Sequence, residues 1–324
     1  MTQNAFPKLI LMTADRLAPP GVAMIQQAGH QLRLLGSADP EGEMADIMAS
    51  HPVAALISRT LKVTAGHIAS CPTLRIISRH GVGHDIVDLE AATAHGIPVT
   101  IAEAANAQSV AELAIGLMFA AARRIPQADT DIRAGGWDRS NAGIQLAGCR
   151  LGLVAYGAIG RAVARMARGI GLSVAVYDPH ALREDGIDWH DDLDSLLAAS
   201  DILSLHAPLL PQTRNMIGAA QLSRLPKGAI IINTARGGLI DERALAAALS
   251  DGHVAAAGID TFAHEPLPAD HAFHKLPQVV MTPHLGGSTR QSLDSVAISA
   301  VRNVLAMLDG DGPDPRLVVN PDVL

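Results

Sequence analysis

Residues 151–179 read LGLVAYGAIGRAVARMARGIGLSVAVYDP, and this stretch decides the fold. An apolar segment leads into Ala155-x-Gly157-x-x-Gly160, a helical pattern follows, and a second apolar segment ends at Asp178. Such a strand–turn–helix–strand unit is typical of a dinucleotide-binding Rossmann fold. Gly157 would let the backbone approach a pyrophosphate, and Gly160 would let the helix pack closely on the strand.

The start of this helix is expected to present the amides of Ala158 and Ile159 to the phosphates. Asp178 follows Gly160 by 18 residues, near the spacing at which a carboxylate accepts hydrogen bonds from both ribose hydroxyls. Its charge would repel a 2′-phosphate, so the sequence predicts NAD rather than NADP as the cofactor. Ala155 occupies a position that is glycine in the full pattern, and we expect its methyl group to crowd the turn.

Strand-like and helix-like segments alternate along the chain, which predicts parallel α/β sheets. In the first part we expect strands over residues 8–12, 31–35, 53–57, 74–78 and 97–100, with helices over 20–28, 41–50 and 89–95. A long helix over about 107–124 follows. In the second part we expect strands over 151–155, 173–177, 202–206, 229–233, 255–259 and 279–282, and helices over 159–169 and about 292–308. Two sheets joined by long helices predict two lobes.

Composition excludes several classes of protein. The 324 residues carry a net charge of -7 and no run of lysine and arginine, which argues against nucleic-acid binding. Cys71 and Cys149 form no C-x-x-C pair, so we expect a reduced, cytoplasmic protein without a disulfide framework. The N-terminus lacks the apolar region of a signal peptide. The most apolar helical stretch, residues 110–122, contains Glu112 and is too short to span a bilayer.

Three later stretches place ionisable side chains at the ends of expected strands. They are IIINTARGGLID (230–241) with Arg236, GIDTFAHEPLP (258–268) with Asp260 and Glu265, and VVMTPHLGGST (279–289) with His284. Because doubly wound sheets bind ligands at the carboxyl ends of their strands, we expect these side chains to share one site. The alternative for His284 is a histidine that caps a turn or fills a core.

The chain resembles the D-isomer-specific 2-hydroxyacid dehydrogenases over nearly its whole length, and the phosphoglycerate dehydrogenases among them. The matching stretches follow the family order: SRHGVGHDIVDLEAAT (78–93), NAQSVAELAIGLM (106–118), GWDRS (136–140), the 151–179 unit, LHAPLLPQT (205–213), NTARGGLIDERAL (233–245), GIDTFAHEPLP and TPHLGGST (282–289). The resemblance implies reversible hydride transfer between NAD and a small anionic 2-hydroxy or 2-keto acid.

By this resemblance, three residues carry the chemistry. Arg236 would bind the substrate carboxylate and polarise the reacting oxygen. His284 would donate a proton to that oxygen in reduction and take it back in oxidation, and Glu265 would stabilise the imidazolium. A cap or salt bridge for Arg236, and a solvated loop acid for Glu265, are the simpler alternatives.

The resemblance also implies the binding sets. The cofactor set is Gly157, Ala158, Ile159, Gly160, Asp178, His206, Ala207, Pro208, Thr213, Thr234, Ala235, Arg236, Asp260, His284 and Gly286, and Asp260 would hold the nicotinamide carboxamide. The substrate set is Arg59, Arg79, Val82, Gly83, Arg236 and His284. The amides around Val82 and Gly83 would bind the substrate carboxylate.

The sequence is compatible with more than one substrate class. Arg59 and Arg79 fall where phosphoglycerate dehydrogenases place arginines that face the substrate, and two guanidiniums suit a phosphorylated or doubly anionic acid. Either arginine can instead pair with an acid of its own lobe. Relatives that reduce glyoxylate or hydroxypyruvate have similar sequences near Arg79, so a glyoxylate/hydroxypyruvate reductase is the alternative.

The implied architecture is a Rossmann domain, residues 105–289, inserted into a discontinuous flavodoxin-like substrate domain, residues 1–104 and 290–324. The resemblance also implies a homodimer formed through the helix near 107–124 and the segment after it. The chain stops at Leu324, so we expect no regulatory domain of the kind that some phosphoglycerate dehydrogenases carry.

The same fold serves in NAD(H)-sensing corepressors, but the chain shows no long disordered tails or peptide-docking extensions, which favours an enzyme. A metal site built from His264, His271 and His274 is not expected, because Pro266 and Pro268 prevent one helix from presenting all three. No HExxH pattern occurs either.

Overall fold

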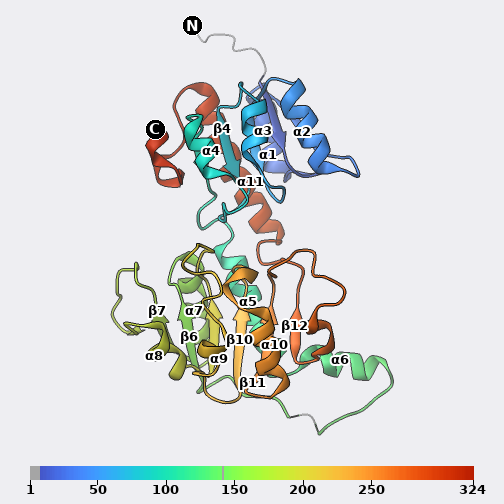
Figure 1. Ribbon diagram of the computed structural model, residues 1–324, viewed down its shortest axis with the longest axis vertical. Coiled ribbons are helices and arrows are strands. Elements are labelled where there is room, and N and C mark those ends of the chain that lie inside the picture. Colours follow the sequence, from blue (N-terminus) through green and yellow to red (C-terminus); the bar gives the residue numbers. More distant parts are fainter. Residues whose placement is uncertain (1–7, 141) are drawn as a thin grey trace. The chain divides into compact units, whose positions relative to one another are not determined.

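The computed structural model describes residues 8–140 and 142–324, which form two units (Figure 1). Unit 1 holds residues 8–106 and 288–324, and unit 2 holds residues 107–287. Residues 1–7, which the sequence analysis assigns to the substrate domain, lie outside the described residues. Each unit is built on one parallel sheet, so the predicted α/β class with two sheets is confirmed.

The sheet of unit 1 has five parallel strands in the order β2-β1-β3-β4-β5. They are β1 (Leu9–Met12), β2 (Gln31–Leu34), β3 (Val53–Ser58), β4 (Ile76–Arg79) and β5 (Val99–Thr100). This is the flavodoxin-like order, in which the direction of the connections reverses between β1 and β3. Central strand β3 is buried along its whole length, which accounts for its unbroken run of small and apolar residues.

Helices from both ends of the chain cover this sheet. They are α1 (Pro19–Gln27), α2 (Pro40–Ser50), α3 (Ala65–Ser70), α4 (Leu89–Ala94) and α11 (Arg290–Asp309), with short 3-10 turns η3 (Pro315–Leu317) and η4 (Pro321–Val323). Helix α11 packs on α1, β3 and β4, and the hydroxyl of Ser78 donates to the carbonyl of Ala300 at 3.1 Å. The last long helix therefore belongs to the core of unit 1.

The sheet of unit 2 has seven parallel strands in the order β12-β11-β10-β9-β6-β7-β8. They are β6 (Arg150–Val154), β7 (Ser173–Tyr177), β8 (Asp188–Trp189), β9 (Ile202–Leu205), β10 (Ala229–Asn233), β11 (Val254–Ile259) and β12 (Val279–Met281). The connections reverse between β6 and β9, as in a doubly wound Rossmann sheet, and loops at the carboxyl ends of these strands form its ligand-binding edge.

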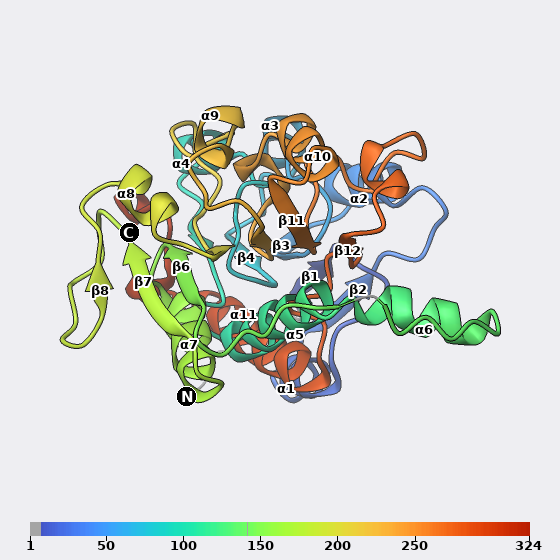
Figure 2. The ribbon, with the colours of Figure 1, turned by 90° about the horizontal axis from the view of Figure 1, so that it is seen from below.

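Helices and short turns surround this second sheet. They are α5 (Ala107–Ala122), α6 (Ile125–Arg133), α7 (Ala158–Gly169), α8 (Leu193–Ala198), α9 (Ala219–Leu222), α10 (Glu242–Ser250), η1 (Gly237–Leu239) and η2 (Ala272–Lys275). Helix α5 packs on α7, β10 and β11, whereas α6 projects away from the sheet of unit 2 (Figure 2). In residues 8–140 and 142–324, no helix combines the length and the apolar character needed to cross a membrane.

Candidate active site

The turn between β6 and α7 shows how the glycine pattern works. A Cβ atom on Gly160 would lie 2.5 Å from the carbonyl oxygen of Ala155, so only glycine fits there. In contrast, no described atom lies within 4 Å of the corresponding position on Gly157, which is the N-cap of α7. This leaves room for a ligand next to the first helical amides, as phosphate binding requires. Ala155 has a φ of 75°, a left-handed conformation that costs an alanine about 1 kcal/mol or more.

Asp178 lies directly after β7, and backbone amides hold its carboxylate. One oxygen accepts from the amide of Tyr156 at 2.8 Å, and the other accepts from His180 at 2.9 Å and Ala181 at 3.1 Å. The carboxylate thus fixes the glycine turn as well as its own loop. Its contact with the ribose hydroxyls stays a prediction, and the sequence pattern does not indicate its role in the turn.

Tyr156 and Arg161 belong to a cluster of aromatic and charged side chains at this end of the sheet. The ring of Tyr156 meets Trp189 edge-on, with centroids 5.3 Å apart, and the guanidinium of Arg161 lies 4.9 Å from the same ring. Arg161 also pairs with Glu184, which accepts the Tyr156 hydroxyl at 3.4 Å. The sequence does not predict this cluster, because a tyrosine inside a glycine-rich turn belongs to no motif of its own.

Two polar atoms near the carboxyl ends of β9 and β10 are buried without a hydrogen-bond partner in the described part of the chain. They are Nδ1 of His206 and Oγ1 of Thr234. Burial lowers the pKa of His206 to about 4, so its ring is neutral at pH 7. Since buried polar atoms are nearly always paired, two such atoms at the ligand edge fit a polar cofactor. The residues present therefore suit a dinucleotide.

The loop after β9 is closed by the hydroxyl of Thr213. It donates to the carbonyl of Pro208 at 2.7 Å and accepts from the amide of Leu210 at 2.7 Å. Ala207 is buried in the core of unit 2. These members of the predicted cofactor set lie at the ligand edge, and their contacts with a cofactor stay predictions.

Arg236 follows β10 in a loop that Asn233 holds in place. The buried amide of Asn233 donates to the carbonyl of Arg236 at 2.9 Å and accepts from the amide of Ala235 at 3.1 Å. A Cβ atom on Gly237 would overlap the backbone of Phe262, so this loop and the loop after β11 touch. The glycine therefore brings the arginine next to the loop that carries Glu265.

Glu265 and His284 form a direct pair. Nδ1 of His284 lies 2.8 Å from Oε2 of Glu265, and the side chains are 47% and 37% exposed. His284 has a φ of 53°, a conformation that is uncommon outside glycine and that clusters at functional sites. Within the described chain, Nε2 of His284 has no hydrogen-bond partner, so it can face a substrate oxygen.

Several charges and hydrogen bonds act on Glu265. Burial alone would raise its pKa, but hydrogen bonds from His284 and the amide of Phe262, and the charges of His284 and Arg236, lower it below 4.5. Glu265 is therefore ionised throughout the neutral range. The loop that carries Arg236 touches the loop that carries Glu265, and Glu265 contacts His284, so the three predicted catalytic side chains lie on neighbouring loops of unit 2.

Asp260 is fully buried at the end of β11 and organises the loop that carries His284. Its carboxylate accepts from the hydroxyl of Thr282 at 2.6 Å and from the amides of Leu285 at 2.7 Å and Gly286 at 2.9 Å. Its carbonyl accepts from the amide of His284 at 2.8 Å. The predicted contact of Asp260 with a nicotinamide carboxamide stays a prediction, beside a positioning role that the sequence did not reveal.

A second glutamate–histidine pair supports the same region. Glu242 accepts from the amide of Ala263 at 2.8 Å, and its other oxygen lies 3.2 Å from Nε2 of His271. His274 contacts the carbonyl of Pro268. No three His, Cys, Asp or Glu side chains in residues 8–140 and 142–324 are arranged to hold a metal ion. Glu242 lies in stretch 233–245, which resembles the family, and this resemblance is the sequence feature that could have pointed to Glu242.

The two arginines predicted to bind substrate in unit 1 differ in burial and in their contacts. Arg79 is 6% exposed, and its guanidinium donates to the carbonyls of Gly83 at 2.7 Å, Ser58 at 2.6 Å and Arg59 at 2.9 Å. It ties the loop after β3 to the loop with Val82 and Gly83. Arg59 is partly exposed, and its amide donates to the hydroxyl of Thr13. Arg79 thus positions loops, and a direct substrate contact stays a prediction.

Comparison with known proteins identifies the family. Residues 115–286 match the D-isomer specific 2-hydroxyacid dehydrogenase, NAD binding domain. The chain is also 39% identical to the glyoxylate reductase of Thermococcus litoralis over 277 residues, which are 82% of each chain. The chain belongs to the D-isomer specific 2-hydroxyacid dehydrogenase family. The resemblance seen in the sequence is confirmed.

Relatives in this family differ in substrate and in length. The D-3-phosphoglycerate dehydrogenase of Mycobacterium tuberculosis is 39% identical over 307 residues, which are 93% of this chain and 57% of the relative. The chain thus spans little more than half the length of that dehydrogenase. An NADPH-dependent glyoxylate/hydroxypyruvate reductase from Sinorhizobium meliloti, solved with NADP and malonate, is 28% identical, with a TM-score of 0.86 over 98% of both chains.

Proposed function

We propose that the protein is an NAD-dependent 2-hydroxyacid dehydrogenase that transfers a hydride reversibly between nicotinamide and a small anionic 2-hydroxy or 2-keto acid. The observation that carries this proposal is the convergence of Arg236, Glu265 and His284 beyond β10, β11 and β12. A cation, a proton donor and a carboxylate that orients the donor are the groups that carbonyl reduction needs.

A bound nicotinamide supplies the hydride or receives it. For the reduction, Arg236 would bind the carboxylate of the keto acid through its planar guanidinium and polarise the carbonyl. Nε2 of His284 would give its proton to the carbonyl oxygen, which becomes the hydroxyl of the product. Glu265 holds Nδ1, which fixes the tautomer and stabilises the protonated ring. In oxidation, the neutral ring would take the proton back.

NAD rather than NADP is proposed because Asp178 stands at the end of β7, where its negative charge would face a 2′-phosphate. The Sinorhizobium relative is NADPH-dependent, whereas a formate dehydrogenase from Staphylococcus aureus is NAD-dependent, so the preference varies among structural neighbours. The values of kcat/KM for NADH and NADPH with one keto acid test this part. Equal values would contradict it.

For the substrate we propose a phosphoglycerate dehydrogenase-like preference, with the glyoxylate/hydroxypyruvate reductase as the second candidate. The similarity to the Mycobacterium dehydrogenase supports the first, and the 82% coverage of the Thermococcus glyoxylate reductase supports the second. The values of kcat/KM for NADH-dependent reduction of 3-phosphohydroxypyruvate, hydroxypyruvate and glyoxylate distinguish the two candidates. A chain that binds NADH and reduces no 2-keto acid would instead be a binding protein of the corepressor type.

A homodimer is proposed from the apolar surface near α6. No residue of α6 is buried, and large apolar side chains stay exposed there: Phe119 at 37%, Ile125 at 51%, Ile132 at 52% and Trp137 at 78%. Sedimentation of the chain and of Ile125→Asp measures this, and a monomer in both cases would contradict it. A cytoplasmic location is also proposed, supported by the free state of Cys71 and Cys149.

A further inference from the structure

The proposed proton transfer does not involve two buried polar atoms of unit 2. They are Nδ1 of His206 and Oγ1 of Thr234, neither of which has a hydrogen-bond partner among the residues that the structure describes. The two residues lie side by side at the carboxyl ends of β9 and β10, because Leu205 pairs with Asn233 in the sheet. An unpaired buried polar atom costs free energy, so this pair favours a ligand that satisfies both atoms.

The neighbours of His206 place these atoms between two parts of the expected ligand site. The amide of His206 donates to the carbonyl of Val154 at 2.9 Å, and Val154 is the last residue of β6 before the glycine turn. On the other side, Thr234 stands two residues before Arg236. The two atoms thus lie between the turn expected to bind the pyrophosphate and the loop of the proposed substrate arginine. In a bound dinucleotide, the group between the pyrophosphate and the nicotinamide is a ribose.

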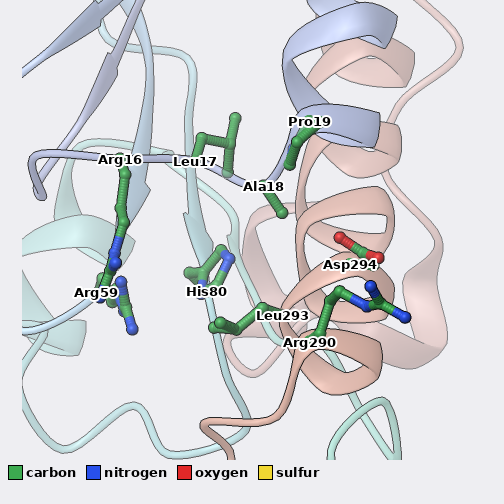
Figure 3. A pocket seen from close by; sticks show the side chains of 9 residues that line it. All are labelled: Arg16, Leu17, Ala18, Pro19, Arg59, His80, Arg290, Leu293 and Asp294. Carbon is green, nitrogen blue, oxygen red and sulfur yellow. The ribbon is translucent and has the colours of Figure 1, made fainter.

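His206 and His80 both have a pKa of about 4, for different reasons. His80 lines a pocket of about 300 Å³ in unit 1 beside Arg59, and burial together with the charges of Arg59 and Arg79 lowers its pKa (Figure 3). For His206 the cause is burial, and its ring is neutral at pH 7. A neutral imidazole carries its proton on one nitrogen only, and the hydrogen bond at the other nitrogen decides which.

Ser204 decides which nitrogen of His206 carries the proton. This serine is fully buried in β9, on the same face of the strand as His206, and its Oγ lies 3.0 Å from Nε2 of the ring. Among the described residues, the ring is the only hydrogen-bond partner of this hydroxyl. The hydroxyl proton therefore has one acceptor, Nε2, and a nitrogen that accepts a hydrogen bond carries no proton. The proton of the neutral ring is left on Nδ1, which makes Nδ1 a donor.

A donor at Nδ1 of His206, beside the hydroxyl of Thr234, matches a hydroxyl group of the ligand. A hydroxyl accepts one hydrogen bond and donates another, so its oxygen can accept from Nδ1 while its proton goes to Oγ1 of Thr234. A phosphate fits less well, because the ring is neutral and phosphates bind most strongly to charged donors. A sugar hydroxyl is therefore the favoured partner.

We propose that Ser204 is a positioning residue that holds His206 with its proton on Nδ1, so that the ring donates to a hydroxyl of the ribose next to the nicotinamide, and that Thr234 accepts from the same hydroxyl. This inference rests on the proposed NAD-dependent function. It gives the second histidine at the ligand edge a role in holding the cofactor, separate from the proton transfer proposed for His284.

Two substitutions of His206 separate the roles of its nitrogens. The side-chain amide of asparagine reaches the place of Nδ1, whereas that of glutamine reaches the place of Nε2. Calorimetry compares the affinity for NADH, which has the nicotinamide-side ribose, with the affinity for ADP, which lacks it. We expect His206→Gln to raise the Kd of NADH about three- to tenfold and His206→Asn to change it less than about twofold, with the Kd of ADP unchanged in both. Equal NADH affinity in the two variants, or an equal loss for NADH and ADP, would overturn the inference.

Ser204→Ala tests whether the serine acts through the ring. It should raise the Kd of NADH about two- to fivefold in the unmodified chain and have no effect in the His206→Asn variant, whose shorter side chain does not reach Ser204. The matched control is Ser200→Ala, which removes another fully buried hydroxyl, one that donates to the carbonyl of Leu196 before β9. It should leave the ratio of the two Kd values unchanged. The same loss from Ser204→Ala in both backgrounds would show a merely structural role and refute the proposal.

The tautomer itself can be measured by nitrogen NMR of the chain with isotope-labelled histidine, because the two nitrogens of a neutral ring give different signals in the two tautomers. The His206→Asn variant identifies the ring by its missing signals. We expect the proton on Nδ1 at pH 7 in the unmodified chain, and a mixture of tautomers in Ser204→Ala. A proton on Nε2 of the unmodified chain would contradict the proposal whatever the affinities of the variants.

Binding of NADH separates this inference from the proposed function. If the chain reduces no 2-keto acid but the His206 and Ser204 variants change NADH affinity as expected, the dehydrogenase is refuted and the inference stands. If the chain reduces a 2-keto acid and every variant binds NADH as tightly as the unmodified chain, the inference is refuted and the dehydrogenase stands. A chain that binds no NADH would refute both.

Discussion

Replacing Glu265 by Gln removes a charge from the site and leaves its shape nearly intact. The amide oxygen of glutamine can still accept from Phe262, the contact that Oε1 of Glu265 makes at 2.9 Å. What is lost is the carboxylate 2.8 Å from Nδ1 of His284. A hydrogen bond to a charged group contributes about 1.5–3 kcal/mol. Because both side chains are more than a third exposed, we take the low end, about 1.5 kcal/mol.

In the proposed mechanism, oxidation produces the protonated ring of His284, and this energy stabilises that ring. Since about 1.4 kcal/mol corresponds to a factor of ten, Glu265→Gln should lower kcat for oxidation about tenfold. The pKa of Glu265 is lowered from 4.5, so its carboxylate is ionised and makes this contribution throughout the neutral range.

The assay is steady-state kcat for oxidation of the 2-hydroxy acid, measured for the chain and for two variants. Glu242→Gln is the matched control, because it removes the same charge from a neighbouring glutamate–histidine pair that does not include His284. It should leave kcat unchanged. A kcat of Glu265→Gln that equals or exceeds that of the unmodified chain would show that Glu265 does not stabilise the protonated ring of His284.

Three further changes test other parts of the site. His284→Gln should lower turnover by roughly 10²–10⁴-fold, the usual contribution of a general acid or base, and steady-state turnover within threefold of the parent would remove His284 from the mechanism. Asp178→Ala should relax the preference for NADH over NADPH, measured as a ratio of kcat/KM, and a parent chain that already uses both cofactors equally would refute this role. Ala155→Gly relieves the left-handed alanine and should stabilise unit 2 by roughly 1 kcal/mol, seen as a melting temperature about 2–4 °C higher; a lower melting temperature would contradict the strain.

The sheets could be predicted from the sequence because buried parallel strands consist of short apolar runs. The predicted strands 173–177 and 229–233 have the observed limits of β7 and β10. The predicted strand 74–78 is shifted, because the amide of Leu74 bonds to Cys71 in a turn and β4 begins at Ile76. Strand β8 has two residues, too few for a periodic pattern to appear.

For the candidate site, the sequence predicts which side chains stand at the ends of the strands, but it does not predict their hydrogen-bond partners. The pattern places Arg236 and His284 at one edge, since parallel strands end together. It does not show which donors a carboxylate meets, because that depends on the path of each loop. The contact of Asp178 with Tyr156 and the contact of Arg79 with Gly83 therefore appear only in the structure.

The buried carboxylate of Asp260 explains how His284 can keep an unfavourable backbone conformation. A left-handed conformation in a residue other than glycine costs about 1–3 kcal/mol. Asp260 accepts three hydrogen bonds from residues within two positions of His284, and each bond to a charged group contributes about 1.5–3 kcal/mol. Together the three bonds outweigh the strain. Because all of them form within unit 2, His284, the proposed proton donor, is held in its orientation before any substrate binds.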